Sequence, residues 1–490
     1  MIRIDVLPDN VLLDIFYLYS MAMNSSLFYK KGVEAWQSLV HVCQRWRNLV
    51  FGSPRRLDLQ LYCTVGTPAK DRLDIWPALP LIIQGLPSLS STMDNIRPAL
   101  RLTGFIGQGF PSPSLSMDNI IAALGQSNRV RHVVLYLAGW QWEGILAQMQ
   151  VPFPELADLR LWLIDGIDET PAIPDSFLGR SAPRLRALYL NRISFPGLPK
   201  LLLSATHLVE LDLYGTPHSA YISPKAMVAL LSVISSLETF GLGFRSPQSR
   251  PHLESPSPPH PKRSILPILR TLYFRGVIEY LEELVTRIDA PQLGKMEIVF
   301  FNQIDFDCPR LTQFINYTPT LRGLDEARVQ FDNHTASVTL RSQTSKFRFD
   351  CLRLCISCRE RGWQLSSIEQ VCNSLPHLST VEDLYVERRY PVLVRKGDSI
   401  ENALWLEILL RFTMVKNLFL SEGSVLDITD ALQELVRGRI IEVLPSLQNI
   451  FVDGRELFAS FQENIGQFVA ARQLSNHPVT ISAWEKLTQS

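Results

Sequence analysis

The sequence has no excess of either charge and no long apolar run. Lysine plus arginine number 48 and aspartate plus glutamate also number 48 among 490 residues. A balanced charge gives no electrostatic reason to bind nucleic acid or an acidic membrane. The opening residues, MIRIDVLPDN, carry acids where a signal peptide has an apolar run, and no stretch approaches ~18 uninterrupted apolar residues. We therefore expect a soluble intracellular protein, cytoplasmic or nuclear, with no nucleic-acid or membrane partner.

Motifs for catalysis and metal binding are scarce as well. The seven cysteines are odd in number and unevenly spread, which is typical of reduced thiols. The nine histidines never show the spacing of a zinc hydrolase, and there is no G-x-S-x-G, P-loop or kinase signature. The sequence thus predicts no enzyme, no metal site and no cofactor.

Three of the cysteines lie close together in the sequence. Cys351, Cys355 and Cys358 have the spacing with which radical-SAM enzymes hold an iron–sulfur cluster, for which the thiolates must converge. The surrounding FRFDCLRLCISC alternates like a strand, in which Cys351 and Cys355 point one way and Cys358 the other. We interpret it as a strand with incidental cysteines.

The stretch 7–50 predicts two helices with wide apolar stripes. Pro8 suits the first position of a helix, and Asp9 follows in its positively polarised first turn. The first stripe comprises Leu7, Val11, Leu12, Ile15, Phe16 and Tyr19, and the second comprises Trp36, Leu39, Val40, Cys43, Trp46 and Val50. Two helices of ~15 residues cannot bury such stripes against each other alone. Part of this surface is therefore expected to meet a partner or the next domain.

These residues resemble the F-box, the adaptor-binding motif of SCF-type ubiquitin ligases, and are most similar to F-box proteins of mushroom-type fungi. The similarity lies in Leu7-Pro8, in the run through Phe16, in Val42-Cys43-x-x-Trp46-Arg47 and in the RRLDLQLYC tail. Asn10, where the motif commonly has an acid, and a longer connector depart from it. The resemblance implies a Skp-type adaptor as partner, and through it a cullin and a RING protein. It implies that the adaptor contacts are Leu7, Pro8, Leu12, Ile15, Phe16, Leu39, Val42, Cys43 and Trp46.

Behind this head the chain repeats itself. The pattern apolar-x-x-apolar-x-apolar recurs on average about every 29 residues, at the top of the ~20–29 range of leucine-rich repeats. Its twelve starts are Val130, Leu156, Leu185, Leu208, Leu237, Leu269, Leu293, Leu324, Phe349, Val381, Val415 and Leu447. The segments between them predict helices, for example after the N-cap Ser223 and along the stripe from Val277 to Ile288. A doubly wound domain is the alternative, but no strand is followed by a glycine-rich phosphate loop.

The resulting fold prediction is α/β: a small all-α F-box head followed by a leucine-rich-repeat α/β horseshoe (solenoid). We assign 1–52 to the F-box helical domain, and 53–128 to a linker and first irregular repeats with a duplicated insertion. The solenoid spans 129–475, with a disordered proline-rich loop at 246–263, and a C-terminal tail spans 476–490. The duplication is the similarity of 85–100 to 109–124, in which ten of sixteen aligned positions are identical.

In a horseshoe the outward positions of the strands line the concave face. Two such positions per strand give 24, of which eight are aromatic, whereas the 9% aromatic content of the chain would give about two. Strands favour aromatic residues anyway, but Tyr, Trp and Arg also dominate interface hot spots. We therefore predict that an unknown protein substrate contacts Tyr136, Arg160, Trp162, Tyr189, Tyr214, Tyr273 and Arg275.

The resemblance and the repeats together predict the substrate-recognition subunit of an SCF-type E3 ubiquitin ligase. In this role the F-box binds the adaptor and the repeats hold the target, without chemistry from this chain. Two alternatives stay open: a non-degradative F-box scaffold that recruits no cullin, and a repeat protein whose N-terminal hairpin is only a cap.

Overall fold

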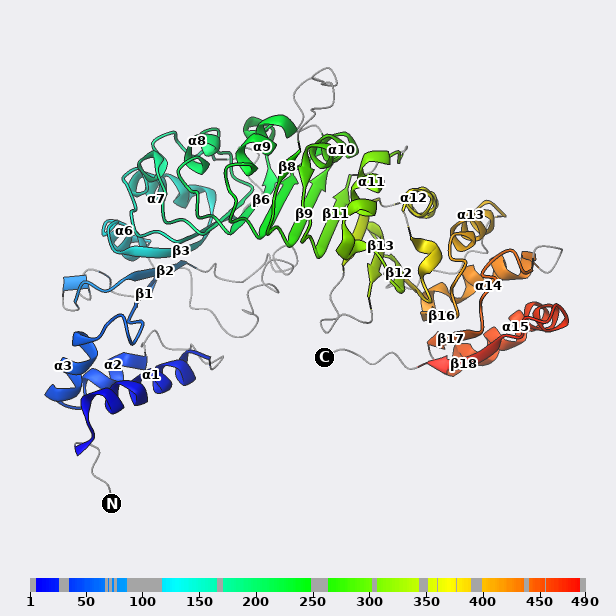
Figure 1. Cartoon of the computed structure of the whole chain (residues 1–490), viewed down its shortest axis with the longest axis horizontal. Coiled ribbons are helices and arrows are strands. Elements are labelled where there is room, and N and C mark those ends of the chain that lie inside the picture. The colour runs from blue at the N-terminus through cyan, green and yellow to red at the C-terminus, as the bar shows by residue number, and fades with distance from the viewer. Residues whose placement is uncertain are drawn as a thin grey trace. The chain divides into compact units, whose positions relative to one another are not determined.

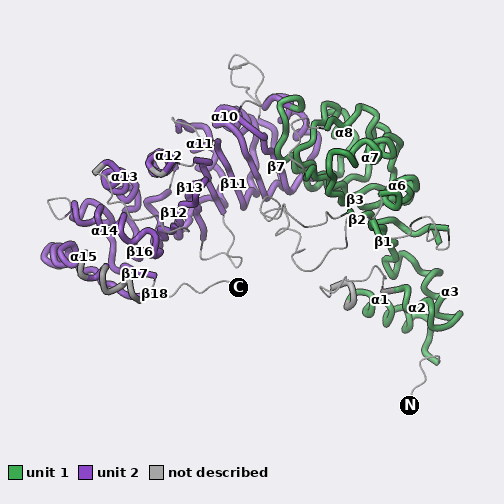
Figure 2. Tube along the Cα trace, turned by 180° about the vertical axis from the view of Figure 1, so that it is seen from behind, with its two compact units in different colours: residues 1–220 green, residues 221–490 purple. Residues whose placement is uncertain are grey.

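The computed structural model describes residues 6–25, 35–66, 69, 73–74, 77–85, 117–164, 171–247, 263–301, 306–342, 351–358, 360–375, 377–388, 399–435, 440–453 and 455–484. The chain forms two compact units, Met1–Ala220 and Tyr221–Ser490, shown in green and purple in Figure 2. Each unit combines a largely parallel sheet with helices, which is consistent with a leucine-rich-repeat-like fold. In the described ranges no helix is long and apolar enough to cross a membrane.

The first unit begins with a helical head of three helices, where the sequence predicted two. They are α1 (Asp9–Ser25), α2 (Ala35–Val40) and α3 (Gln44–Gly52) (Figure 1). The second predicted helix is interrupted at Cys43, whose backbone is extended and whose Sγ accepts a hydrogen bond from the Trp46 N–H at 3.5 Å. Cysteine is not among the residues that usually cap helices, so this break could not be predicted from the residue type at position 43.

The head has a packed interior. The rings of Phe16 and Trp46 lie 4.6 Å apart, and Leu12, Phe16 and Val50 are fully buried. Trp36 is buried as well, and its Nε1 donates to the Gln60 carbonyl at 3.0 Å. This last contact ties the head to the segment that leads into the first strand.

The sheet of unit 1 is parallel and follows chain order. Its strands are β1 (Leu61–Thr64), β2 (Leu81–Gly85), β3 (Val130–Leu137), β4 (Asp158–Leu163), β5 (Ala187–Asn191) and β6 (Glu210–Thr216). Helices α6 (Asp118–Leu124), α7 (Trp142–Gln148) and α8 (Leu198–Leu202) lie on one side of it (Figure 1). The strand leucines on the helix side, such as Leu135, Leu161 and Leu213, are buried. The opposite side, called here the open face, carries the outward positions.

Unit 2 continues the strand–helix alternation. Its strands are β7 (Thr239–Phe244), β9 (Thr271–Gly276), β11 (Lys295–Phe300), β12 (Glu326–Phe331), β13 (Thr335–Arg341), β14 (Leu352–Ser357), β15 (Asp383–Arg388), β16 (Asn417–Leu420), β17 (Asn449–Asp453) and β18 (Thr480–Trp484). Its helices are α9 (Pro224–Leu231), α10 (Ile278–Arg287), α11 (Pro309–Tyr317), α12 (Arg361–Ser374), α13 (Ser399–Leu410), α14 (Val425–Glu434) and α15 (Arg455–Leu474). A separate two-residue pairing joins β8 (Ser264–Ile265) to β10 (Ile288–Asp289).

Eleven of the twelve predicted repeat starts lie in the described ranges and each leads into a strand, while Phe349 lies outside those ranges. Two predicted helix features are confirmed. Ser223 caps α9, its Oγ accepting from the Ala226 N–H at 3.4 Å. The stripe along α10 is buried, including Tyr280, Leu281 and Leu284. Within the predicted tail, β18 pairs in parallel with β17, so residues 480–484 belong to the sheet.

One part of the sheet departs from the parallel order of the other strands. β12 and β13 form an antiparallel hairpin, β13 is also antiparallel to β14, and the spatial order is β11-β14-β13-β12-β15. The hairpin closes at Asp332, whose N–H donates to the Thr335 carbonyl at 2.8 Å. The repeat pattern predicted β12 and β14, but it did not predict β13, which lies between them.

Two predicted insertions lie largely outside the described residues. Of the duplicated stretch 85–124, the structure describes Gly85, which ends β2, and 117–124, which includes α6. Of the predicted loop 246–263, it describes only 246, 247 and 263. Strands β1 and β2 lie in the region assigned to linker and irregular repeats.

Candidate functional site

The predicted adaptor-binding residues fall into two groups in the head. Leu12, Phe16 and Leu39 are buried, and Leu7 and Trp46 are half-buried. The exposed members are Pro8, Ile15, Val42 and Cys43. Only the exposed group is readily accessible to a partner, while the buried group packs in the interior of the head.

α1 carries exposed apolar residues that the prediction left out. Leu18 is 65% exposed and Ile15 is 39% exposed, and Val11 lies one turn before Ile15 on the same side of the helix. Val42, in the turn before α3, is 59% exposed. Val11 belongs to the predicted apolar stripe, but the predicted contact set took only Leu7, Pro8, Leu12, Ile15 and Phe16 from this stretch, and it left out Val11 and Leu18.

On the open face of unit 1 the strand register brings predicted substrate contacts together. Val134, Arg160, Tyr189 and Asp212 form one row across β3 to β6, and Tyr136, Trp162, Asn191 and Tyr214 form the next. Aromatic rings stack within the second row and between the two rows. Tyr136 and Trp162 are 4.3 Å apart and nearly parallel, and Trp162 and Tyr189 are 4.6 Å apart at 32°.

Stacking reduces the exposed surface of these aromatic side chains. Trp162 is only 5% exposed and Tyr136 is similarly buried, whereas Tyr189 is half-buried and Tyr214 is 41% exposed. Burial raises the pKa of Tyr136 to about 12 and that of Tyr189 well above its ordinary value, so both phenols stay neutral. The stack is therefore an apolar platform, and Tyr214 is its most accessible aromatic neighbour.

Charged residues surround the platform. Arg160 Nε lies 2.9 Å from Asp158 Oδ1, and its Nη2 lies 3.3 Å from Glu210 Oε2. Burial raises the pKa of the Asp212 carboxyl to about 7, although the Arg160 charge acts against this shift. Burial also lowers the pKa of His132, so the imidazole adds no positive charge at neutral pH.

The two remaining predicted contacts, Tyr273 and Arg275, lie on β9 in unit 2. Lys295 Nζ donates to the Tyr273 hydroxyl at 2.9 Å, and the Arg275 guanidinium lies 5.6 Å from the centre of the Phe301 ring. The structure thus places five of the predicted contacts on neighbouring strands of unit 1 and two on a different unit. Contact with a substrate stays a prediction for all seven.

Unit 2 has an aromatic stack of its own, which the prediction counted but did not choose. Tyr385 and Phe419 stack at 4.2 Å, Phe419 and Phe451 at 4.7 Å, and Trp484 meets Phe419 edge-on at 5.3 Å. The Arg328 guanidinium covers Tyr385, with 4.4 Å to the ring centre. A hydrogen-bonded row runs beside the stack, from Asp383 through Asn417 and Asn449 to Thr480.

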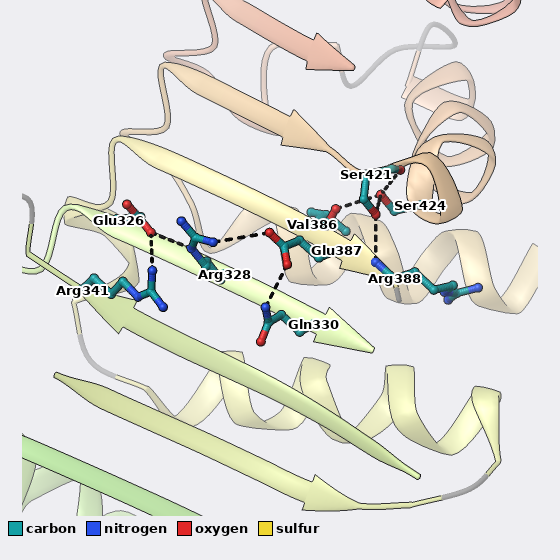
Figure 3. Close-up of polar contacts among 9 residues, drawn as sticks. All are labelled: Glu326, Arg328, Gln330, Arg341, Val386, Glu387, Arg388, Ser421 and Ser424. Carbon is teal, nitrogen blue, oxygen red and sulfur yellow. Dashed lines mark hydrogen bonds and ion pairs between the residues drawn. The ribbon is translucent and has the colours of Figure 1, made fainter. Parts of the chain in front are cut away.

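Acidic and basic side chains are paired across the middle of this face (Figure 3). Glu326 lies 2.7 Å from Arg328 and 3.6 Å from Arg341, and Glu387 lies 3.4 Å from Arg328. Gln330 also donates to Glu387, at 2.9 Å. These contacts pair Glu326, Arg328 and Glu387 of β12 and β15 with one another and with Arg341 of β13.

The cysteines form no visible metal site. Cys355 lies in β14 and is buried, which raises the pKa of its thiol, while Cys351 precedes that strand and Cys358 follows it. Among the described residues no group of three or more His, Cys, Asp or Glu side chains could hold a metal ion.

Comparison with known proteins assigns no family. No protein-family model matches the chain, and no curated protein matches it. One similar solved structure is the leucine-rich repeat-containing protein LegL7 from Legionella pneumophila, with 13% sequence identity and a TM-score of 0.30, covering 71% of this chain and 99% of that one.

Proposed function

We propose that this chain is the substrate-recognition subunit of an SCF-type E3 ubiquitin ligase. In this proposal the helical head binds a Skp-type adaptor and the strand–helix repeats bind a target protein. One observation supports adaptor binding by the head. Its interior is packed around Phe16, whereas the apolar residues Ile15, Leu18 and Val42 are exposed. Exposed apolar clusters of this kind commonly mark protein contacts.

The repeats support the second half through their open faces. Strands of both units carry aromatic and charged side chains on the side opposite the helices, among them the exposed Tyr214, and such side chains dominate protein-binding hot spots. The chain would act by holding the target near the partner enzyme, so that its ubiquitin reaches target lysines. The rate gain then comes from proximity and orientation, with no reacting group from this chain.

A second reading, in which the head only caps the repeats, has an observation in its favour. The Trp36 Nε1–Gln60 bond and the burial of Trp36 join the head to the segment before β1. A cap needs such a junction, but it does not need exposed apolar residues on α1. The scaffold alternative, which binds the adaptor without recruiting a cullin, uses the same head surface.

Stepwise reconstitution tests these readings. The full chain is mixed first with a purified Skp-type adaptor and then with a cullin–RING complex, and each step is followed by size-exclusion chromatography. The proposal expects co-elution at both steps. Co-elution with the adaptor alone would indicate the scaffold, and failure at the first step would leave the cap.

A further inference from the structure

The open face of unit 1 carries more acid than base. Across β3 to β6 its acidic side chains are Asp158, Glu210 and Asp212, and its one arginine is Arg160. Arg160 is shared by Asp158 and Glu210, at 2.9 and 3.3 Å. Among the described residues Asp212 has no hydrogen bond or ion pair, so its carboxylate is the one whose charge lacks a direct partner.

Asp212 is also placed beside aromatic rings. It stands in register with Tyr189 on β5, and it lies two residues before Tyr214 on the same side of β6. Asp212 is half-buried and Tyr214 is exposed, so a ligand that reaches Tyr214 also comes close to the carboxylate. Aromatic faces attract cations, and a poorly solvated carboxylate gains more from a cation than one in open water.

The open face of unit 2 provides a contrast. Strand register gives it five basic and five acidic side chains, namely Lys295, Arg275, Arg328, Arg341 and Arg353 against Glu297, Glu326, Glu387, Asp383 and Asp453. Glu297, Glu326 and Glu387 each contact an arginine. Acids and bases are therefore equal in number on the unit 2 face, whereas the unit 1 face has three acids to one arginine and places Asp212 two residues before the exposed Tyr214.

We propose that the open face of unit 1 binds a lysine or arginine side chain of the target protein, with Asp212 as its ion-pair partner and Tyr214 and Tyr189 as its aromatic walls. This inference rests on the proposed function, since it names the chemistry of the target that the repeats would hold. A cation bound there would supply the charge that Asp212 lacks, and the stacked Trp162 would hold Tyr189 in position.

The test uses three fluorescently labelled peptides, Gly-Ser-X-Gly-Ser-X-Gly-Ser, in which X is arginine, lysine or glutamate. Binding to the full chain is measured by fluorescence anisotropy. We expect the arginine or lysine peptide to bind and the glutamate peptide not to bind. Asp212→Asn should weaken the cationic peptide about tenfold, and Tyr214→Ala about threefold, because one removes the charge and the other an aromatic face.

Asp453→Asn is the matched control, because it removes an aspartate beside Trp484 on the open face of unit 2. It should leave peptide binding unchanged. The inference is overturned if no cationic peptide binds, if the glutamate peptide binds equally, or if Asp212→Asn has no larger effect than Asp453→Asn.

Adaptor binding measured on the same samples separates this inference from the proposed function. An intact adaptor complex without cation preference would overturn only the inference. A clear cation preference in a chain that does not bind the adaptor would contradict only the proposed function. Circular dichroism of each variant shows whether it is folded, and the exposed position of Tyr214 makes Tyr214→Ala the safer of the two changes.

Discussion

The ring of Phe16 on α1 packs against the ring of Trp46 on α3, with 4.6 Å between their centres and 56° between their planes. The residues of the F-box-like motif therefore fall into two groups: some pack in the interior of the head and hold its helices together, and others are exposed. Phe16 belongs to the first group and its neighbour Ile15 to the second. A substitution of Phe16 should therefore lower the stability of the head, whereas a substitution of Ile15 should lower its affinity for a partner.

Phe16→Ala should destabilise the head by about 3–5 kcal/mol, because it leaves a cavity against Trp46. Tryptophan fluorescence during urea unfolding reports this loss, since Trp36 and Trp46 both lie in the head. Ile15→Ala, the matched exposed change, should alter the free energy of unfolding by less than about 1 kcal/mol. Equal destabilisation by the two variants would contradict the packing described here.

On the unit 1 face, Trp162→Ala should cost about 3–5 kcal/mol of stability, because Trp162 is buried between Tyr136 and Tyr189. Weaker target binding by Trp162→Ala would therefore reflect its lower stability as well as the loss of a contact. Tyr214→Ala should leave the thermal midpoint within about 1–2 °C of the wild type. Differential scanning calorimetry of the two variants separates these effects, and a stable Trp162→Ala protein would count against the stack as a structural element.

The buried carboxyl of Asp212 should make the stability of the folded protein depend on pH. Burial raises the pKa of its carboxyl to about 7, above its ordinary value, so the protonated form favours the folded state. This contribution is fully present below about pH 4 and is lost as the pH rises through about 7. Asp212→Asn, which keeps a neutral side chain, should therefore melt at a higher temperature than the wild type at about pH 8.

The difference between the two melting temperatures should shrink towards about pH 4.5, where the wild-type carboxyl is largely protonated. The charged groups that act on Asp212 are Arg160 and Glu210, and Arg160 keeps its charge over this range. A melting-temperature difference independent of pH would show that Asp212 does not titrate in this way.

In unit 2, Arg388 and Asp427 form an ion pair at 3.0 Å with side chains only 8% and 12% exposed. Asp427→Ala should destabilise the unit by about 3–5 kcal/mol, because it leaves a buried guanidinium without its carboxylate. Glu382→Ala is the control, since its pair with Lys416 at 2.9 Å is exposed and should be worth at most about 1 kcal/mol. Urea unfolding compares the two, and similar midpoints would argue against the pair as a stabilising contact.

The sequence located the repeated strands well, because buried leucines at fixed spacing leave a strong pattern. It missed β1, β2 and β18, which lie outside the region where the pattern was counted, and β13, whose antiparallel pairing depends on the turn at Asp332. It also predicted one helix where Cys43 separates α2 from α3. The hairpin turn at Asp332 and the helix cap at Cys43 explain the last two differences, and neither produces a periodic apolar pattern in the sequence.

Binding residues were harder to predict than strands. The spacing placed Trp162 and Tyr214 on the same face, which the register confirms. It could not show that Trp162 is covered by its neighbours while Tyr214 is exposed, because that depends on ring stacking between strands far apart in sequence. The same limit applied to Phe16 and Ile15, whose burial is decided by α3.

The central claim is that the exposed side of α1 binds a Skp-type adaptor, and the most direct measurement is the affinity of the full chain for a purified adaptor. Isothermal titration would compare the wild type with Ile15→Glu and with Leu203→Glu, an exposed leucine after α8 that serves as control. We expect Ile15→Glu to weaken adaptor binding at least about 100-fold, because it places a charge in an apolar interface, while Leu203→Glu should bind like the wild type. Unchanged binding by a folded Ile15→Glu protein, or no binding by the wild type, would contradict it.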